Sequence, residues 1–249
     1  MLQISNLHKS FDGVHAVQDF SLSLLPRQIT SLIGPNGAGK TTVFNLITGF
    51  LSADGGDATY HSASLLSLTP WRIARMGISR TFQNLRLFHR MTILESVLLG
   101  RQNQPGERFL NALLAFRKGS KEHREAVDAS MTLVEFVGLV DHRYELVENL
   151  SYGQQKLLSI ACCLATEPYL ILLDEPVAGV QPKMVEKIAE VLKDLVSRQE
   201  KTILLIEHDI DFVLRISDRV VVMDDGKKIR EGAPEEVRNT PQILEAYLS

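Results

Sequence analysis

The chain has 249 residues, of which 45% are apolar and 23% are charged. This length and composition provide a buried core for one large domain or two small ones and exclude a disordered tail protein. The formal net charge of −3 excludes binding of a polyanion by bulk attraction, so a nucleic-acid role would require a local basic patch.

Apolar runs such as residues 170–173 and 220–223 are far shorter than the ~20 residues that a membrane-spanning helix needs. The first residues also lack the apolar stretch and the cleavage pattern of a secretory signal. We therefore expect a cytoplasmic chain without a membrane span. We interpret the adjacent Cys162 and Cys163 as buried thiols, because adjacent cysteines suit neither a disulfide nor a metal site.

The N-terminal part has the pattern of strands followed by a glycine-rich loop and a helix. Apolar and polar residues alternate at 2–4 and at 20–24, which is the period of half-buried strands. Residues 29–33 form a short apolar run that predicts a buried strand. A glycine-rich run follows, and residues 40–48 predict a helix closed by Gly49.

The middle of the chain is helical, and strands return after it. Between about residues 92 and 165, apolar residues recur at helical spacing. The elements predicted after it are a strand at 169–173, a helix with apolar positions between 184 and 195, a strand at 202–206, a hairpin with arms 219–223 and 227–231 around Asp224-Asp225-Gly226, and a short helix capped by Thr240-Pro241. Strands that alternate with helices outside a helical insertion predict the α/β class with a mainly parallel sheet.

The residues after the predicted strand at 29–33 fit the phosphate-loop pattern G-x-x-x-x-G-K-[ST]. The glycines of such a loop let backbone N–H groups approach phosphate oxygens at a helix N-terminus. Lys40 would add charge at the β and γ phosphates, and the Thr41 hydroxyl would ligate Mg²⁺. An ordinary glycine turn is the alternative, and the glycine order disfavours the dinucleotide pattern G-x-G-x-x-G. The predicted phosphate-binding residues are Gly34, Pro35, Asn36, Gly37, Ala38, Gly39, Lys40 and Thr41.

Two carboxylates, Asp174 and Glu175, end the apolar run 170–173. Asp174 at the tip of this strand would lie beside the phosphate loop and hold Mg²⁺. Glu175 would act as the general base for the water that attacks the γ phosphate. A plain acidic turn before Pro176 is the alternative, and the phosphate loop upstream disfavours it.

Residues 150–154, with the sequence Leu-Ser-Tyr-Gly-Gln, open a predicted helix. Ser151 and the Gly153 backbone can offer hydrogen bonds and a positive helix end to a phosphate, although Ser151 would also serve as a plain helix cap. The stretch resembles the L-S-G-G-Q signature of ATP-binding cassette proteins, which implies that Ser151, Gly153 and Gln154 bind nucleotide. Tyr152 replaces the family's usual glycine, so this position does not need glycine's backbone freedom here.

The same resemblance assigns roles to residues elsewhere in the chain. Gln83 and His208 fit the family's Q-loop and H-switch. This implies that Gln83 contacts Mg²⁺ or the attacking water, and that His208 bonds the γ phosphate and steadies Glu175. Taken alone, Gln83 would be interpreted as an ordinary surface amide, and His208 as an ordinary histidine at the end of a strand. Phe11 fits the aromatic that stacks on adenine, with core packing as the alternative, and Thr42 joins the nucleotide-binding set.

These motifs occur in the family's order between residues 11 and 208, so the resemblance covers essentially the whole chain. It implies a single nucleotide-binding domain over residues 1–249, built as a P-loop NTPase core with a mainly parallel sheet. An N-terminal antiparallel β subdomain and an α-helical subdomain inserted at about residues 88–165 complete the implied architecture.

Within the family, residues 80–88, 100–127 and 231–248 look like the ATPases of branched-chain amino-acid importers. The resemblance implies hydrolysis of ATP with Mg²⁺ to energise a separate membrane permease for branched-chain amino acids or related amides. The implied partners are a second cassette subunit, identical or paralogous, the permease, and indirectly a periplasmic or extracellular solute-binding protein. The implied location is the inner face of the cell membrane, without nucleic acid. The alternatives are another transport system, for example for lipopolysaccharide or urea, and a soluble cassette ATPase.

Apolar residues follow Gln83 in the same loop, where Leu85, Leu87 and Phe88 are interleaved with Arg86. A loop that senses the γ phosphate is useful only if it also contacts what must move. We therefore interpret these residues as a docking surface for a helix of the permease. Packing inside the helical insertion is the alternative.

Overall fold

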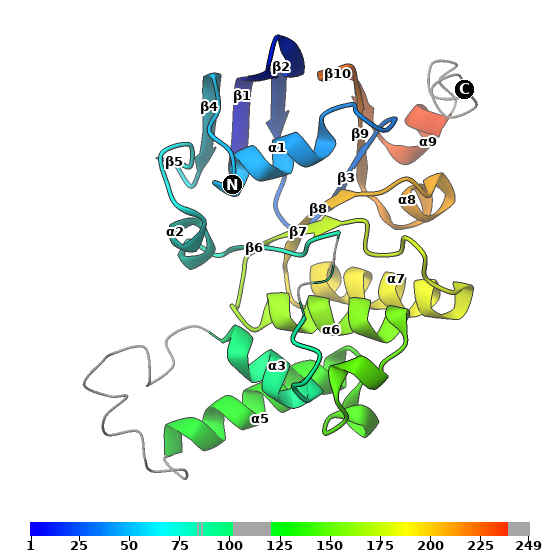
Figure 1. Ribbon diagram of the computed structural model, residues 1–249. Coiled ribbons are helices and arrows are strands. Elements are labelled where there is room, and N and C mark those ends of the chain that lie inside the picture. Colours follow the sequence, from blue (N-terminus) through cyan, green and yellow to red (C-terminus); the bar gives the residue numbers. More distant parts are fainter. Residues whose placement is uncertain (84, 86, 102–120, 239–249) are drawn as a thin grey trace. The chain divides into compact units, whose positions relative to one another are not determined.

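The computed structural model describes residues 1–83, 85, 87–101 and 121–238 (Figure 1). The chain divides into two compact units. The first unit contains Met1–Gln83, Tyr169–Ala178 and the described residues from Leu192 onward. The second unit contains Gly179–Val191 and the described residues of Asn84–Pro168, the segment within which the expected helical insertion at about 88–165 falls.

The first sheet of the first unit is antiparallel and has four strands, in the order β2-β1-β4-β5. The alternating pattern in the sequence predicts the positions of two of its strands, whereas β4 and β5 were not predicted. Paired glycines and polar residues dilute the apolar alternation of β4, and β5 is only a short pairing at its end. The strands are β1 (Leu2–Phe11), β2 (Val14–Ser23), β4 (Gly55–Tyr60) and β5 (Ala63–Ser64).

The second sheet has six strands in the order β10-β9-β3-β8-β7-β6, and every pairing in it is parallel except that of β9 with β10. Every residue of β3, β7 and β8 is buried, which explains why apolar residues dominate these strands, although the buried Thr30 and Ser31 interrupt the run in β3. The strands are β3 (Ile29–Ile33), β6 (Ile78–Arg80), β7 (Leu170–Asp174), β8 (Thr202–Ile206), β9 (Arg219–Asp224) and β10 (Lys227–Gly232). The predicted α/β class with a mainly parallel sheet is confirmed.

One hydrophobic core joins the two sheets of the first unit. Its buried side chains include residues of β1, β2 and β4 of the first sheet, of β3, β6, β7, β8 and β9 of the second, and of helices α1 and α2. Among its described residues, this unit contains the helices α1 (Lys40–Ile47), α2 (Pro70–Arg75), α8 (Ile210–Ile216) and α9 (Pro234–Arg238), together with the end of α7 (Pro182–Ser197) from Leu192 onward. The core therefore fixes α1, and the loop before it, against the carboxyl ends of the parallel strands.

The second unit is helical over its described residues. A capping box formed by Thr92 and Glu95 starts α3, and α3 packs against both α5 and α6. Gly100 at the end of α3 lies so close to the Cys162 carbonyl that a larger residue would collide with α6. The helices are α3 (Ile93–Gly100), α5 (Lys121–Phe136), α6 (Tyr152–Leu164) and the first part of α7 (Pro182–Ser197). Short 3₁₀ turns lie at Val140–His142 and Val147–Asn149.

Several element boundaries differ from the prediction by one residue. The first predicted helix ends at Ile47 rather than at residue 48, and the strand predicted at 169–173 lies at Leu170–Asp174. The short helix predicted from Thr240-Pro241 lies outside the described residues. Cys163 is buried and Cys162 is half-buried, both as free thiols, and burial raises the pKa of Cys162 to about 12. Within the described ranges, no helix is both long and apolar enough to cross a membrane.

Candidate functional site

The loop between β3 and α1 requires glycine at two positions. Gly34 and Gly39 both have positive φ. A Cβ at Gly34 would collide with the backbone carbonyl of Met223, and a Cβ at Gly39 would collide with that of Ala16. β9 and β2 therefore press directly on the loop. Gly226, in the turn between β9 and β10, donates its N–H to the carbonyl of Ala38 at 3.2 Å.

Lys40 opens α1 and is buried. Its Nζ donates to the carbonyls of Gly34 and Pro35, each at 2.7 Å, so the ammonium lies across the glycine-rich loop. Burial lowers the pKa of Lys40, while the nearby carboxylates of Glu175 and Asp174 act in the opposite direction. Anionic oxygens at this position would meet a partly desolvated cation at a helix N-terminus.

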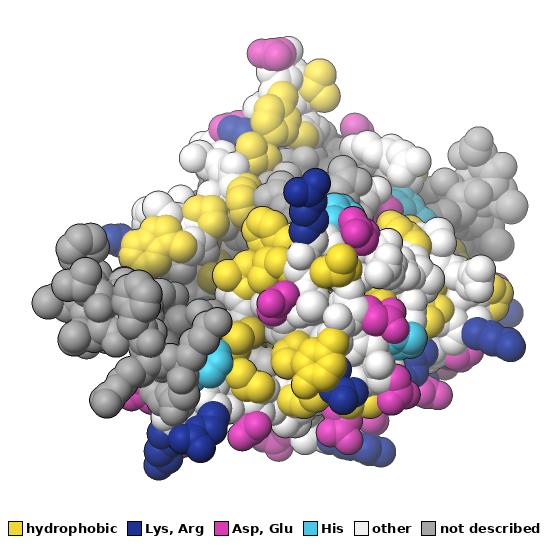
Figure 2. Space-filling view, turned by 60° about the horizontal axis from the view of Figure 1, so that its bottom comes forward, with side chains coloured by type: hydrophobic (Ala, Val, Ile, Leu, Met, Phe, Trp, Pro, Cys, Tyr) yellow, Lys and Arg dark blue, Asp and Glu magenta, His cyan; other side chains and the backbone are white. Residues whose placement is uncertain are grey.

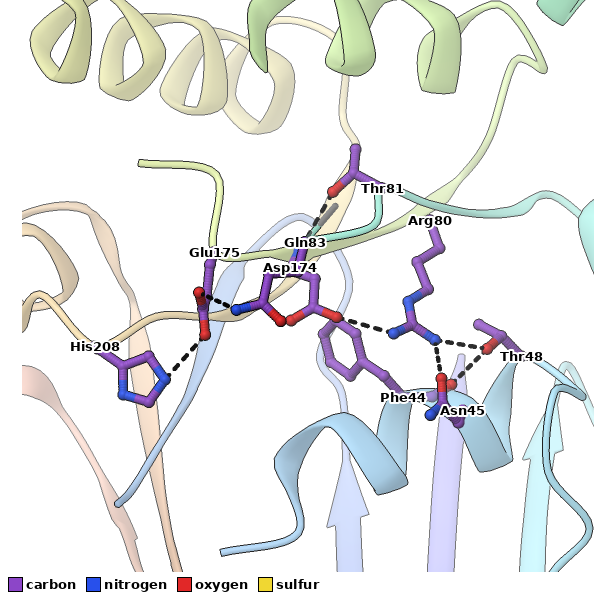
Figure 3. Close-up of polar contacts among 9 residues, drawn as sticks. All are labelled: Phe44, Asn45, Thr48, Arg80, Thr81, Gln83, Asp174, Glu175 and His208. Carbon is purple, nitrogen blue, oxygen red and sulfur yellow. Dashed lines mark hydrogen bonds and ion pairs between the residues drawn. The ribbon is translucent and has the colours of Figure 1, made fainter. Parts of the chain in front are cut away.

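The three predicted catalytic residues lie together at the carboxyl edge of the parallel sheet (Figure 3). Gln83 Nε2 donates to Glu175 Oε2 at 2.8 Å, and His208 Nε2 lies 3.0 Å from Glu175 Oε1. Glu175 has a left-handed backbone, with φ of 50°, and its N–H donates to the Ile206 carbonyl at 2.9 Å. We refer to Gln83, Glu175 and His208 as the carboxylate cluster.

Asp174 ends β7 in a buried position. Its Oδ2 accepts from Arg80 Nη2 at 2.9 Å, and its backbone N–H donates to Thr81 Oγ1 at 3.3 Å. The side chain of Asp174 is 2% exposed and that of Arg80 is 6% exposed. No motif in the sequence assigns a role to Arg80, although a charged residue at the end of a buried strand is a visible signal.

The donor set predicted for Mg²⁺ consists of the Asp174 carboxylate, the exposed Thr41 hydroxyl and the exposed Gln83 amide. All of these supply oxygen atoms, which Mg²⁺ prefers. No group of three His, Cys, Asp or Glu side chains in the described part of the chain could hold a metal ion by itself. Mg²⁺ is normally shared between one or two carboxylates, substrate phosphates and water.

Glu207 is a second residue that the sequence analysis missed. It is 1% exposed, and its carboxylate accepts from the N–H of Val177 at 2.9 Å and from its neighbour His208 at 3.0 Å. Burial raises the pKa of Glu207, and these backbone hydrogen bonds offset part of that effect. Glu207 thus connects the segment after Glu175 to the segment that carries His208. Its position directly after a buried apolar strand was the available signal.

Phe11 lies at the end of β1 and is 42% exposed, so it is not part of the core. Phe11 pairs with Val14 of β2. Two residues further along β2, the carbonyl of Ala16 packs against Gly39. Lys9 Nζ lies 5.4 Å from the centroid of the Phe11 ring. The register therefore places an exposed aromatic on the strand pair that contacts the glycine-rich loop.

In the second unit, Ser151 caps α6. Ser151 Oγ accepts from the Gln154 N–H at 3.4 Å, and Gln154 Oε1 accepts from the Ser151 N–H at 2.9 Å, which completes a capping box. Gly153 is buried where any side chain would overlap Met184 of α7. Tyr152 has ordinary helical backbone and is 46% exposed, as expected for a position that needs no glycine.

The structure describes only part of the segment after Gln83 that we interpret as a docking surface for the permease. Asn84 and Arg86 lie outside the described residues. Leu85 and Leu87 are half-buried, and Phe88 is 60% exposed. Of the other nucleotide-binding candidates, Asn36 and Gly37 are exposed at the tip of the loop, and Thr42 in α1 is half-buried.

The sequence pattern of the family described as "ABC transporter" matches residues 17–178. The high-affinity branched-chain amino acid transport ATP-binding protein LivG of Salmonella typhimurium is 43% identical over 248 residues, which cover 100% of this chain and 97% of that protein. The crystal structure of an ATP-binding cassette of an ABC transporter in its ADP conformation has a TM-score of 0.87 and 35% identity, and covers 100% of this chain and 98% of its own.

A dimeric ATP-binding cassette bound to ADP and phosphate is also similar, with a TM-score of 0.78 and 25% identity over 94% of this chain and 99% of the other. The family match spans most of the chain, and the match to LivG spans all of it. The chain therefore belongs to the ABC transporter family, as an ATP-hydrolysing nucleotide-binding cassette.

Proposed function

We propose that this cassette hydrolyses ATP to energise import of branched-chain amino acids, or related amides, through a separate membrane permease. The observation that carries this proposal is the full-length identity to LivG, whose name describes a branched-chain amino acid transport protein. The cassette would work at the inner face of the cell membrane. A periplasmic or extracellular solute-binding protein would deliver the solute to the permease.

The glycine-rich loop would bind the phosphates of ATP. Its backbone is held in shape by β2, β9 and the Gly226 turn, so it needs little reorganisation when nucleotide arrives. Lys40 would exchange its two carbonyl partners for oxygens of the β and γ phosphates, and Phe11 would stack on adenine.

Mg²⁺ would be held by Thr41 and Asp174, with Gln83 as a further contact. The ion would neutralise charge on the β and γ phosphates during transfer. Asp174 would keep its orientation through Arg80 and Thr81.

Glu175 would act as the general base. It would take a proton from the water whose oxygen attacks the γ phosphorus, while the bond to the bridging oxygen breaks and ADP leaves. Gln83 and His208 each hold one oxygen of Glu175, so the carboxylate is already oriented before substrate binds. His208 would bond the γ phosphate once that group is present.

Two cassettes would form the working ATPase, with Ser151, Gly153 and Gln154 of each subunit completing the site of the other. The similar dimeric cassette supports the pairing of two subunits. The positive N-terminal end of α6, capped by Ser151, would face a phosphate of the partner's nucleotide.

A soluble ATPase that acts on nucleic acid is less well supported. The net charge is −3, and on the face shown in Figure 2 the described basic side chains are scattered among acidic ones rather than gathered in a patch. A transport role needs no such patch.

The transport proposal is tested by purifying the tagged full chain from its native membrane and identifying the proteins that accompany it. We expect a permease and a second cassette subunit, and ATP-dependent uptake of leucine, isoleucine or valine into vesicles that contain the complex and the binding protein. Uptake of urea or a lipid instead would overturn the assigned solute, and a complex with nucleic acid would overturn the transport role itself.

The shared site is tested with a mixed dimer that carries Lys40→Ala on one chain and Ser151→Arg on the other. Both lesions then fall in one site, and the second site stays intact. We expect more ATPase activity than in either mutant homodimer. If activity does not exceed that of the homodimers, a crosslink from Ser151 to the partner's phosphate loop decides, and its absence would contradict the shared site.

A further inference from the structure

The guanidinium of Arg80 is buried where three segments of the nucleotide site meet (Figure 3). Arg80 ends β6, and its Nη2 lies 2.9 Å from Oδ2 of Asp174 at the end of β7. Both side chains are almost fully removed from water. Desolvation of two charges is costly, so such a pair is retained only where further contacts hold both groups in place.

The second arm of the guanidinium reaches the helix that follows the phosphate loop. Arg80 Nη1 donates to Asn45 Oδ1 at 2.6 Å and to Thr48 Oγ1 at 3.3 Å. Asn45 lies within α1, and Thr48 is its C-terminal cap residue. One side chain therefore joins the phosphate-loop helix to the carboxylate that is assigned to Mg²⁺.

Two aromatic rings complete the surroundings of Arg80. The guanidinium carbon lies 5.3 Å from the ring centroid of Phe44 and 5.0 Å from that of Phe82. Phe82 directly precedes Gln83 of the carboxylate cluster, and its ring packs edge-on against Phe50 at 5.5 Å. The planar, delocalised guanidinium suits the space beside the two aromatic rings, and its fork of two donors suits the polar partners. A lysine side chain has neither property.

We propose that Arg80 is a positioning residue that orients Asp174 for Mg²⁺ and couples this orientation to α1 and to the segment that carries Gln83. The inference rests on the proposed role of Asp174 as a Mg²⁺ ligand. Arg80 has no direct contact with the metal in this role. It acts as the outer partner of a ligating carboxylate, and such partners commonly change metal affinity by about 10–100-fold.

Arg80→Lys is the informative variant, because it keeps the positive charge beside Asp174 and removes only the planar fork. The measurement is the affinity of the full-length protein, with bound ADP, for Mn²⁺ as a probe of the Mg²⁺ site, followed by electron paramagnetic resonance. Binding of a fluorescent ATP analogue in EDTA reports nucleotide affinity without metal, and thermal unfolding reports stability. We expect Mn²⁺ affinity to fall about tenfold, with metal-free nucleotide affinity unchanged within about twofold.

Arg219→Lys is the matched control. Arg219 also forms an ion pair and a backbone hydrogen bond in the first unit, with Glu231 and the Ser23 carbonyl, and it begins β9, at the end of the strand that lies away from the glycine-rich loop. It should leave Mn²⁺ affinity unchanged. Equal losses of Mn²⁺ affinity in Arg80→Lys and Arg219→Lys would overturn the inference, as would a loss in Arg80→Lys that equals its loss of metal-free nucleotide affinity.

Asp174→Asn separates this inference from the proposed function. If Asp174→Asn lowers Mn²⁺ affinity and Arg80→Lys does not, Arg80 has no positioning role and the metal assignment stands. If Asp174→Asn leaves Mn²⁺ affinity unchanged, the metal assignment itself is wrong. In the double variant we expect no further loss beyond Asp174→Asn, because Arg80 acts through that carboxylate.

Discussion

The carboxylate cluster and the signature segment from Ser151 to Gln154 satisfy their polar groups in different ways. In the cluster, side chains that are far apart in sequence bond one another, so the geometry exists only in the folded first unit. In the signature segment, the bonds join residues three positions apart, as in any well-capped helix. The cluster is therefore complete within one chain, whereas the role proposed for the signature segment requires a partner subunit.

The largest expected effect comes from Glu175→Gln, which keeps the size of the side chain and removes the base. We expect kcat to fall by about 10²–10⁴-fold, with ATP affinity nearly unchanged, because the phosphate contacts remain. ATPase assays and ATP titration measure the two quantities, and Glu122→Gln on the exposed face of α5 is the control. Near-normal turnover would show that Glu175 is not the base, and the carboxylate cluster would then have no assigned catalytic role.

Glu207→Gln tests how strongly the cluster depends on its buried support. An amide can accept only one of the two backbone N–H bonds that the carboxylate accepts, so we expect a loss of about 1–3 kcal/mol in the free energy of unfolding near neutral pH. Chemical denaturation measures it. A loss no larger than that of Glu122→Gln would show that Val177 and His208 are held by other contacts.

The same residue predicts a pH dependence. Burial raises the pKa of Glu207 above its value in the unfolded chain, so over the window between the two values the folded state holds a proton that the unfolded state has released. The contribution of Glu207 to the free energy of unfolding therefore falls as pH rises from the unfolded value of about 4.3 upward. Glu207→Gln should flatten this slope in denaturation curves taken across that range.

Phe11→Ala extends the comparison to the edge of the first unit. Because Phe11 is 42% exposed, its removal should cost little stability, while the loss of stacking on adenine should weaken ATP binding by about tenfold. Phe11→Trp should restore affinity, since it keeps an aromatic face. A stability loss without a change in affinity would mean that the ring serves packing alone.

Ser151→Ala gives the smallest expected effect and tests the other side of the comparison. Removal of the cap should cost about 1 kcal/mol of stability, and Thr92→Ala, at the capping box of α3, should cost a similar amount. Only Ser151→Ala should also lower ATPase activity in the dimer. If both variants change activity equally, the signature segment is a helix start and nothing more.

The elements that the sequence predicts well are those whose signal is local. β3, β7 and β8 are rich in apolar residues because both faces are buried, and the Asp-Gly turn specifies the hairpin of β9 and β10. The approach of Gln83, Glu175 and His208 was expected only through the family resemblance. The geometry confirms that they meet, and their roles stay predictions.

Arg80 and Glu207 could not be assigned because their partners depend on strand order. The register that pairs Arg80 with Leu172 brings its side chain to Asp174, and this register is set by β6 joining the edge of the sheet beside β7. The acceptor role of Glu207 depends on Val177, which belongs to a different crossover. Neither relation leaves a period or a motif in the sequence.

The contact of Gly226 with the phosphate loop has a consequence for synthesis of the chain. The loop lies near the N-terminus, but the turn that holds the Ala38 carbonyl, and the strands that flank β3, come from the last fifth of the sequence. During translation, the contacts that fix the shape of the loop cannot form until these late residues have been synthesised. A nascent cassette should therefore gain affinity for nucleotide only when the hairpin has left the ribosome.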